Sequence, residues 1–357
     1  MKAKKVTALI LACALCASAV TGCGINKNAT AATMKEQTVT MGVANFLCRF
    51  EQASMEDLYK LYLGSSSEST ESIWSRDLSG NGTTLEDSTK NQALEELHEM
   101  YTLQQHMSDY NVEITDDDKA AITEAAKKFM DANSKEAIDE MGATQDIVEE
   151  ILTLYTIKAR MKTAIEADVD TNVSDEEANM RAYSMVSLDI SEGSDDAAKN
   201  KEIASKMEAA LKEDGATLDK VAEDNDQKVT TGTYDADNDT LDEEVKNALD
   251  GLKEGETSGL IETDSKAYFV RIDKDTDADA TEKNRTSIIN QRKDDLYQKV
   301  LSGWQEDDNW KVDEKAVAKI EFKNSFTQQD PNASTESTES TEGTESTPST
   351  ENVESTQ

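Results

Sequence analysis

Residues 230–272 read TTGTYDADNDTLDEEVKNALDGLKEGETSGLIETDSKAYFVRI, and this stretch decides the fold class. Leu241 and Val245 have the spacing of one face of a helix. After a glycine-containing turn, residues 257–262 and 267–273 have the composition of two strands. The stretch therefore predicts a helix followed by a β-hairpin.

A further strand is expected upstream of these two, in the sequence RAYSMVSLDI at residues 181–190. Large apolar and small polar side chains alternate there, which is the period of a half-buried strand. Residues 196–215 and 217–226 separate it from the opening stretch and have helical patterns. Together these segments predict a small unit that mixes helices with a short sheet.

Long helices flank this unit on both sides. Apolar residues at helical spacing predict them over residues 41–63, about 85–110, 115–133, 144–168 and 281–305. The last helix has no partner nearby in sequence, so we expect it to pack back onto the first helices. The expected fold class is α+β, with a mainly helical domain built from both chain ends and an inserted small α/β domain.

This order of elements resembles the SurA/PrsA-type foldases over roughly residues 38–322. The inserted unit resembles a parvulin, a small PpiC-type prolyl isomerase domain. Its most specific match is an L-x-x-G-x-x-S turn at Leu252, Gly255 and Ser258, followed by the final hairpin. The resemblance implies an exported chaperone whose domains divide as follows: a SurA N-terminal-like helical domain at 38–175 and 278–323, and a parvulin-like domain at 176–277.

The chain departs from the parvulin pattern at its two histidines. By the resemblance, the first falls on Ser184 and the second on Tyr268. The chain's two histidines, His98 and His106, lie in the helical part instead, so no histidine-based site is expected in the inserted unit. The catalytic candidates that remain are Asp226, Tyr268 and Ser184. The substrate-binding candidates are Met185, Leu241, Val245 and Tyr268.

The N-terminus predicts export and lipidation. Lysines precede the apolar stretch VTALILACALCASAV, which is too short to span a bilayer comfortably. The following VTGC, residues 20–23, resembles a bacterial lipobox. That resemblance implies that residues 1–22 are a signal peptide and that Cys23 is acylated, for instance with palmitate. The protein would then be a lipoprotein on the outer face of the cytoplasmic membrane, with residues 23–37 as its tether.

The C-terminal residues 324–357 repeat Ser, Thr and Glu and contain almost no apolar side chains. Such a segment buries too little surface to offset its ordering entropy, so we expect it to be disordered. The formal net charge of the chain is −37, which argues against a nucleic-acid partner. It also argues against electrostatic adhesion to anionic lipid, so membrane contact is expected through the lipid anchor.

No cofactor or metal is expected. The residues from Asp235 begin like a calcium loop, but Thr240 and Lys246 stand where glycine and glutamate are required. The sequence shows no phosphate-binding loop, nucleophile elbow or zinc spacing.

The leading functional prediction is a lipid-anchored extracytoplasmic chaperone, or foldase, that binds unfolded exported polypeptides. An active peptidyl-prolyl cis-trans isomerase is the alternative. A solute-binding lipoprotein is a weaker third reading, because it requires two α/β lobes with parallel sheets. Homodimer formation is left open.

Overall fold

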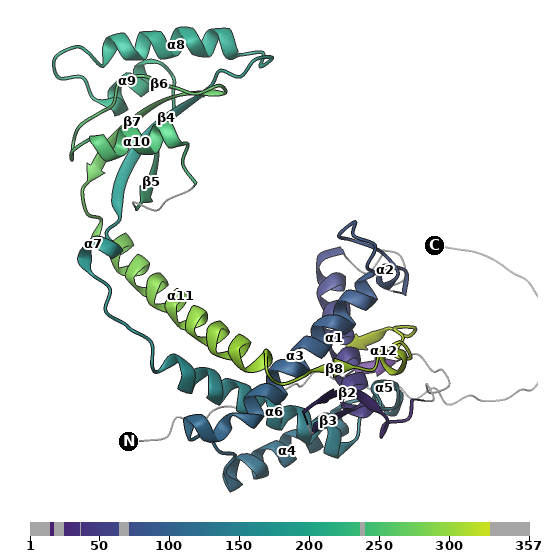
Figure 1. Cartoon of the computed structure of the whole chain (residues 1–357). Helices are drawn as coiled ribbons and strands as arrows, with labels where there is room; N and C mark the ends of the chain where they lie inside the picture. The colour runs from purple at the N-terminus through teal and green to yellow at the C-terminus, as the bar shows by residue number, and fades with distance from the viewer. Residues whose placement is uncertain (1–14, 18–24, 36, 64–70, 236–239, 329–357) are drawn as a thin grey trace, which may run out of the picture. The chain divides into compact units, whose positions relative to one another are not determined.

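The computed structural model describes residues 15–17, 25–35, 37–63, 71–235 and 240–328. The chain divides into two compact units (Figure 1). Unit 1 consists of Met1–Met107, Glu113–Lys158 and Asp308–Gln357, and unit 2 consists of Ser108–Val112 and Ala159–Asp307. Cys23 and most of the expected signal peptide lie outside the described residues, as does the tail beyond residue 328.

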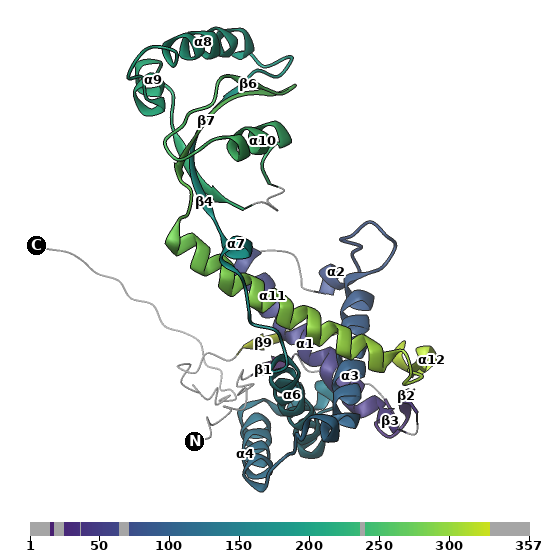
Figure 2. The same ribbon diagram turned by 60° about the vertical axis from the view of Figure 1, so that its left-hand side comes forward.

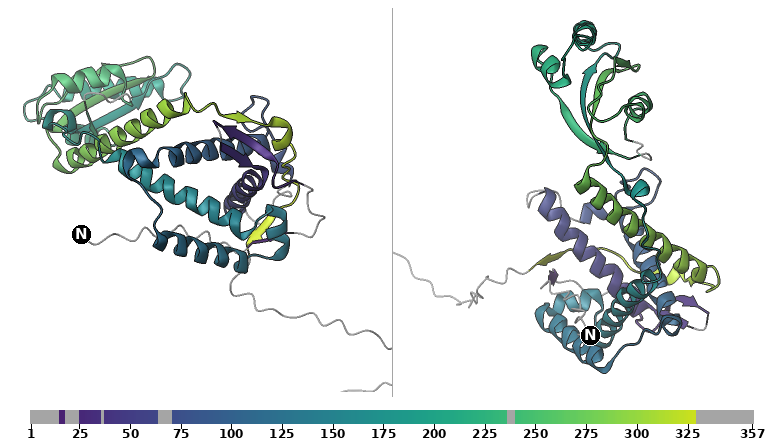
Figure 3. Two further views of the ribbon diagram at one scale, coloured as in Figure 1. Left: turned by 60° about the horizontal axis from the view of Figure 1, so that its bottom comes forward. Right: turned by 90° about the vertical axis from the view of Figure 1, so that its left-hand side faces the viewer.

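Unit 1 is mainly helical. Its helices are α1 (Met41–Leu63), α2 (Glu71–Trp74), α3 (Leu85–Gln105), α4 (Asp116–Ala132), α5 (Lys135–Met141), the first part of α6 (Gln145–Glu166) and α12 (Glu314–Val317). Helix α1 contacts α3, α5 and α12, and Figure 3 shows it in purple among the blue and teal helices. Val43, Phe46 and Leu47 are buried in the core, as their helical spacing predicts.

The expected helices are confirmed with small changes at their ends. Helix α3 ends at Gln105, and the chain then tightens into the 3₁₀ helix η1 (Met107–Tyr110). Cys48 is fully buried in α1, and burial raises the pKa of its thiol to about 12. Leu58, on the same helix, is 52% exposed, so this residue does not join the core. No helix in the described ranges has both the length and the apolar character needed to cross a membrane.

Two small sheets complete unit 1. Strands β2 (Thr30–Met34), β3 (Gln37–Thr40) and β8 (Lys311–Val312) pair antiparallel in the order β3-β2-β8. Strands β1 (Leu15–Ala17) and β9 (Phe326–Gln328) form a separate antiparallel pair.

These strands correct two expectations from the sequence. Much of the expected tether 23–37 is folded, because Ala31, Ala32 and Met34 are fully buried on the central strand β2. The predicted start of the disordered tail at residue 324 lies too early in the sequence, because Phe326 is also fully buried. Strand β2 is ordered by pairing with the neighbouring β3 and the distant β8, and β9 is ordered by pairing with the distant β1.

Unit 2 contains a four-stranded antiparallel sheet. Its strands are β4 (Arg181–Asp189), β5 (Thr230–Tyr234), β6 (Ile261–Glu262) and β7 (Lys266–Lys274), in the order β5-β4-β7-β6. Its helices are α7 (Asp175–Ala178), α8 (Ala197–Ala210), α9 (Leu218–Asp224), α10 (Glu243–Gly251), α11 (Ala278–Gln305) and the last part of α6. The predicted strand at 257–262 pairs regularly only as β6, with an isolated bridge between Thr257 and Arg271.

Helices cover both faces of this sheet. Helices α8 and α9 pack on one face, where Val186, Leu188 and Phe269 are buried. Helix α10 packs on the other face, against Val270 and Ile272 (Figure 2). Side chains of a strand alternate between faces, so each position in β4 and β7 belongs either to the α8/α9 face or to the α10 face.

The return to unit 1 begins at Asp308 rather than at the predicted residue 278, since α11 belongs to unit 2. Two arginines on α11 hold the segment that leads into β4. Arg292 donates to the carbonyl of Asn172 at 2.8 Å and pairs with Glu177. Arg285 pairs with Asp175 at 2.8 Å. The α+β fold class is confirmed, while compactness divides the chain at other residues than the predicted domain boundaries.

Candidate functional site

Tyr268 lies on the α10 face of the sheet. It is 5% exposed, and its hydroxyl donates a hydrogen bond to the carboxylate of Asp242. Asp242 occupies the N-cap position of α10 but makes no side-chain cap bond, so its carboxylate accepts from the tyrosine instead. Burial, followed by this carboxylate, raises the pKa of Tyr268 well above its usual value. The phenol therefore stays neutral and acts as a hydrogen-bond donor.

The other substrate-binding candidates gather beside Tyr268. Met185 of β4, Leu241 and Val245 belong with it to one apolar cluster, which we call the α10 patch. Val245 is buried, whereas Met185 and Leu241 are half-buried and reach the surface. The structure thus brings together all four residues that the sequence selected, and the patch offers apolar contact area next to a hydrogen-bonding phenol.

Ser184 lies on the opposite face of the sheet. Its pairing partner on β7 is Arg271, whereas Tyr268 is paired with Ser187. Directly opposed residues of an antiparallel pair share a face, so Ser184 points toward α8 and α9 and Tyr268 points toward α10. The two positions at which the family's histidines are expected therefore do not face each other.

A charged network holds Ser184 in place. The Ser184 hydroxyl donates to Asp273 at 2.6 Å and accepts from Arg271 at 3.3 Å. Arg271 also donates to Asp273 at 2.7 Å and pairs with Asp219 on α9, which lowers the pKa of Asp219. Ser184 itself is only 2% exposed. This hydroxyl has no nearby general base of the imidazole type, and its bonds serve the packing of α9 on the sheet.

Asp226 stands apart from both groups. It follows α9 in a left-handed conformation with φ of 55°, and its side chain is exposed. Its backbone N–H bonds to the carbonyl of Glu223 and closes the end of the helix. The geometry thus gives Asp226 a role in the turn, and the three catalytic candidates do not form one site.

The two histidines contribute to unit 1. His98 Nε2 lies 2.8 Å from a carboxylate oxygen of Asp308, and Thr102 donates to the same oxygen at 2.8 Å. The His98 ring stacks on Trp310 with centroids 4.6 Å apart. Within the described residues, no three or more His, Cys, Asp or Glu side chains are placed to hold a metal ion.

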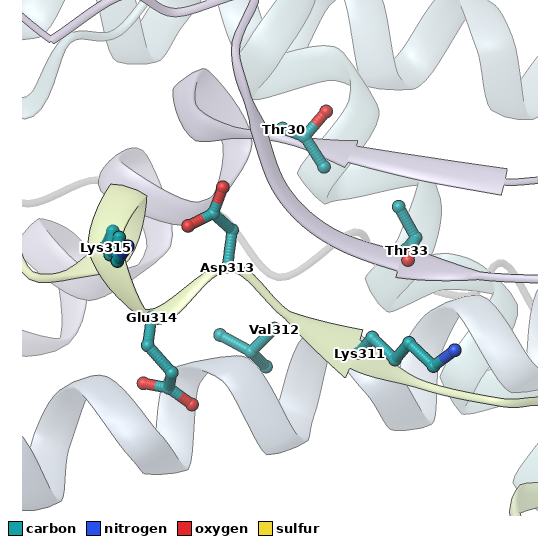
Figure 4. Close-up of a pocket in the computed structure, with 7 residues that line it drawn as sticks. All are labelled: Thr30, Thr33, Lys311, Val312, Asp313, Glu314 and Lys315. Carbon is teal, nitrogen blue, oxygen red and sulfur yellow. The ribbon is translucent and has the colours of Figure 1, made fainter.

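Unit 1 also has a surface hollow of about 500 Å³ beside β2, β8 and α12 (Figure 4). It is lined by Thr30, Thr33, Lys311, Val312, Asp313, Glu314 and Lys315. Asp313 accepts the N–H of Ala316 at 3.0 Å and so caps α12. The lining of the hollow contains two lysines and two acidic residues, so it carries no net charge. No catalytic geometry, such as a nucleophile bonded to a general base, is found among these lining residues.

Residues 177–284 match the family model of the PPIC-type PPIASE domain. This part of the chain is similar to parvulin-type domains. The match covers the sheet, its covering helices and the start of α11, and it confirms the resemblance seen in the sequence. The all-antiparallel pairing of the described strands also disfavours the parallel lobes of a solute-binding protein.

Solved structures similar to the chain include foldases and a SurA-like chaperone. The foldase protein PrsA of Lactococcus lactis is 17% identical, with 82% of this chain and 97% of that chain covered and a TM-score of 0.32. PrsA of Streptococcus pneumoniae is 22% identical, with 64% and 88% covered and a TM-score of 0.29. A SurA-like chaperone of Campylobacter jejuni is 11% identical, with 80% and 99% covered and a TM-score of 0.28. No curated protein matches the chain significantly in sequence.

Sequence reasoning missed the partners that decide how Ser184 and Tyr268 behave. Arg271, Asp273 and Asp242 were unremarkable charges in an acidic chain, and only strand register and helix placement bring them to these side chains. One usable clue was the alternation around Tyr183 and Ser184, because it places adjacent residues on opposite faces.

Proposed function

We propose that this protein is a lipid-anchored extracytoplasmic foldase that binds unfolded exported polypeptides. One observation carries the proposal: the parvulin-type domain keeps a half-exposed apolar patch beside Tyr268 while its Ser184 position is locked in a charged network. Unfolded chains expose apolar side chains and unpaired backbone groups. The α10 patch offers contact area for these apolar side chains, whereas the Tyr268 proton is already donated to Asp242.

Binding is favoured over catalysis by the positions of the candidate groups. Rotation about a peptide bond has a barrier of about 18–20 kcal/mol, which an isomerase lowers by stabilising the twisted amide with pre-placed groups. Here Ser184 and Tyr268 point to opposite faces, and Asp226 faces solvent. The chain therefore supplies a binding surface without a converging set of polar groups.

Suppression of client aggregation tests the proposal. The chain without its first 22 residues should keep a reduced, unfolded client in solution at equimolar concentration. Leu241→Glu should weaken this effect because it places a charge in the α10 patch. Leu78→Glu is a matched control, since Leu78 is 60% exposed in unit 1. Equal aggregation with and without the protein would refute the chaperone function.

Lipid anchoring is tested at Cys23. The lipobox-like VTGC supports acylation of this cysteine, and diacyl attachment is stable where a single chain is marginal. In a bacterial host, wild-type protein should sediment with membranes and carry the mass of a lipid adduct. Cys23→Ala should appear in the soluble exported fraction. Membrane association that survives this change would remove the anchor from the proposal.

The alternative function is prolyl isomerisation, which the family match favours. Exchange between cis and trans forms of an X-Pro peptide, followed by NMR, tests it directly. If activity is present and depends on the Tyr268 donor, Tyr268→Phe should lower the rate and Ser184→Ala should leave it unchanged. No rate above background would leave binding as the function.

Light scattering of the same sample decides whether the chain forms a homodimer.

A further inference from the structure

The last described residues of the chain lie along α1, where three buried side chains hold their backbone. These side chains are Arg49, Gln52 and Glu56, and we call them the α1 clamp. They are spaced to share one face of the helix, and none is more than 1% exposed. Charged and polar side chains are rarely buried so completely unless they are bonded, so the clamp fixes a specific partner.

The clamp binds main-chain atoms of the C-terminal segment. Arg49 donates to the carbonyl of Glu321 at 2.9 Å. Gln52 donates to the carbonyl of Asn324 at 2.9 Å, and the Glu56 carboxylate accepts the N–H of Phe326 at 2.6 Å. The ring of Phe326 is fully buried below the guanidinium of Arg49, 5.0 Å from it. Strand β9, which begins at Phe326, is thereby held rigidly on α1.

The other edge of β9 pairs with β1. Cys16 lies opposite Thr327, and Ala17 lies opposite Phe326. Backbone N–H groups alternate sides along a strand, and that of Phe326 points to Glu56. The N–H of Thr327 therefore points to β1. This edge of β9 holds an extended segment through backbone bonds, and β1 belongs to the stretch that we expect to be removed as a signal peptide.

We propose that this edge of β9 is a second binding site for unfolded polypeptide, which receives an extended apolar segment of a client once the signal peptide has left. The site rests on the proposed function, because it needs removal of residues 1–22 and a polypeptide client. Removal takes β1 away while the α1 clamp still presents β9 as an open strand edge. Pairing with an open edge relies on main-chain bonds, so it tolerates many sequences, as a chaperone requires.

The experiment uses a fluorescent peptide of residues 11–20 carrying Cys13→Ser and Cys16→Ser. We expect saturable binding to the chain that lacks residues 1–22. Thr327→Pro removes the N–H that faces the peptide and should weaken binding about tenfold or more. Thr327→Ala is the matched control, because it keeps that N–H, and it should bind normally. The full chain with residues 1–22 retained should bind at least tenfold more weakly, because β1 already occupies the edge.

Any of these binding results would overturn the site: no saturable binding, equal affinity of the Thr327→Pro and Thr327→Ala chains, or equal affinity of the full and shortened chains. The full-chain comparison decides even if Thr327→Pro fails to fold. A dimer of the shortened chain that excludes the peptide would also overturn it, by assigning the edge to a second copy. Client aggregation is measured in parallel: suppression that depends on Leu241 without peptide binding refutes the β9 site alone, whereas peptide binding without suppression refutes the chaperone function alone.

Discussion

At residue scale, Ser184 and Tyr268, onto which the resemblance places the family's histidines, make separate sets of contacts. The Ser184 hydroxyl links Asp273 and Arg271 under α9, and the Tyr268 phenol bonds to Asp242 at the start of α10. Each side chain is nearly fully buried and hydrogen-bonded. Both side chains therefore contribute to the packing of helices on the two faces of the sheet.

Ser184→Ala should destabilise the protein by about 1–3 kcal/mol. The change removes the hydrogen bonds that the buried Ser184 hydroxyl makes with the carboxylate of Asp273 and the guanidinium of Arg271, and a hydrogen bond to a charged group contributes about 1.5–3 kcal/mol. Urea unfolding followed by circular dichroism measures it. Ser205→Ala on the exposed side of α8 is the control and should change stability by less than about 0.5 kcal/mol. Equal stability of both variants would contradict the structural role of Ser184.

Glu51→Gln should stabilise the protein at neutral pH. Burial, followed by the charge of Glu96, raises the pKa of the Glu51 carboxyl in the folded state. A carboxyl with a raised folded pKa binds its proton more tightly in the folded state, so stability falls as pH rises through the window above the unfolded value. The advantage of the glutamine should therefore be present at pH 7 and disappear in acid. Unfolding curves at both pH values check the sign, and an advantage that grows in acid would refute it.

At element scale, α1 has two different faces in use. Phe46 and Leu47 pack into the apolar core, while the α1 clamp binds the backbone of the C-terminal segment and Arg49 also pairs with Glu140. A protein interior rarely contains a charged side chain without a partner. Here Arg49 pairs with Glu140 and also donates to the carbonyl of Glu321, near the far end of the chain. One helix thus organises the core and the C-terminal strand together.

Arg49→Leu should lower the free energy of unfolding by about 3–5 kcal/mol, because it leaves the carboxylate of Glu140 buried without its counter-charge. The double change Arg49→Leu and Glu140→Leu should recover part of this loss. Denaturant unfolding of the wild type, both single variants and the double variant forms a complete cycle. A purely additive cycle would show that the ion pair contributes nothing beyond the separate side chains.

At the scale of the whole molecule, α11 belongs with the parvulin-type domain. The family match extends to residue 284, into α11, and the arginines of α11 hold the segment that enters β4. The sheet and its helices therefore depend on residues beyond the predicted boundary at 277. The chain returns to unit 1 only at Asp308, which His98 and Thr102 bind.

A fragment of residues 159–307 should fold by itself, whereas a fragment of residues 176–277 should be less stable. The longer fragment is unit 2 almost in full, and it retains the bonds of Arg285 and Arg292 that the shorter one loses. Thermal unfolding by circular dichroism and the dispersion of amide NMR signals compare the two. Equal cooperativity and midpoint in both fragments would show that α11 is dispensable for this domain.

Sequence reasoning recovered most of the fold. Periodicity located the long helices, and the alternation at 181–190 located β4. It also selected Met185, Leu241, Val245 and Tyr268, which the structure brings into one patch. It misjudged residues 30–34 and 326–328: β2 pairs with the neighbouring β3 and with the distant β8, and β9 pairs with the distant β1.

By itself, the sequence determined the α+β class, because helix and strand periods are local, and its resemblance to the parvulins implied the domain that the family model matches at residues 177–284. It also shows that both histidines of the chain, His98 and His106, lie outside residues 177–284. Only the tertiary structure decided that Ser184 and Tyr268 lie on opposite faces of the sheet, and that side chains of α1 bind the backbone of the C-terminal segment. Register and long-range hydrogen bonds are set by which segments meet in space, and no local pattern in the chain encodes those meetings.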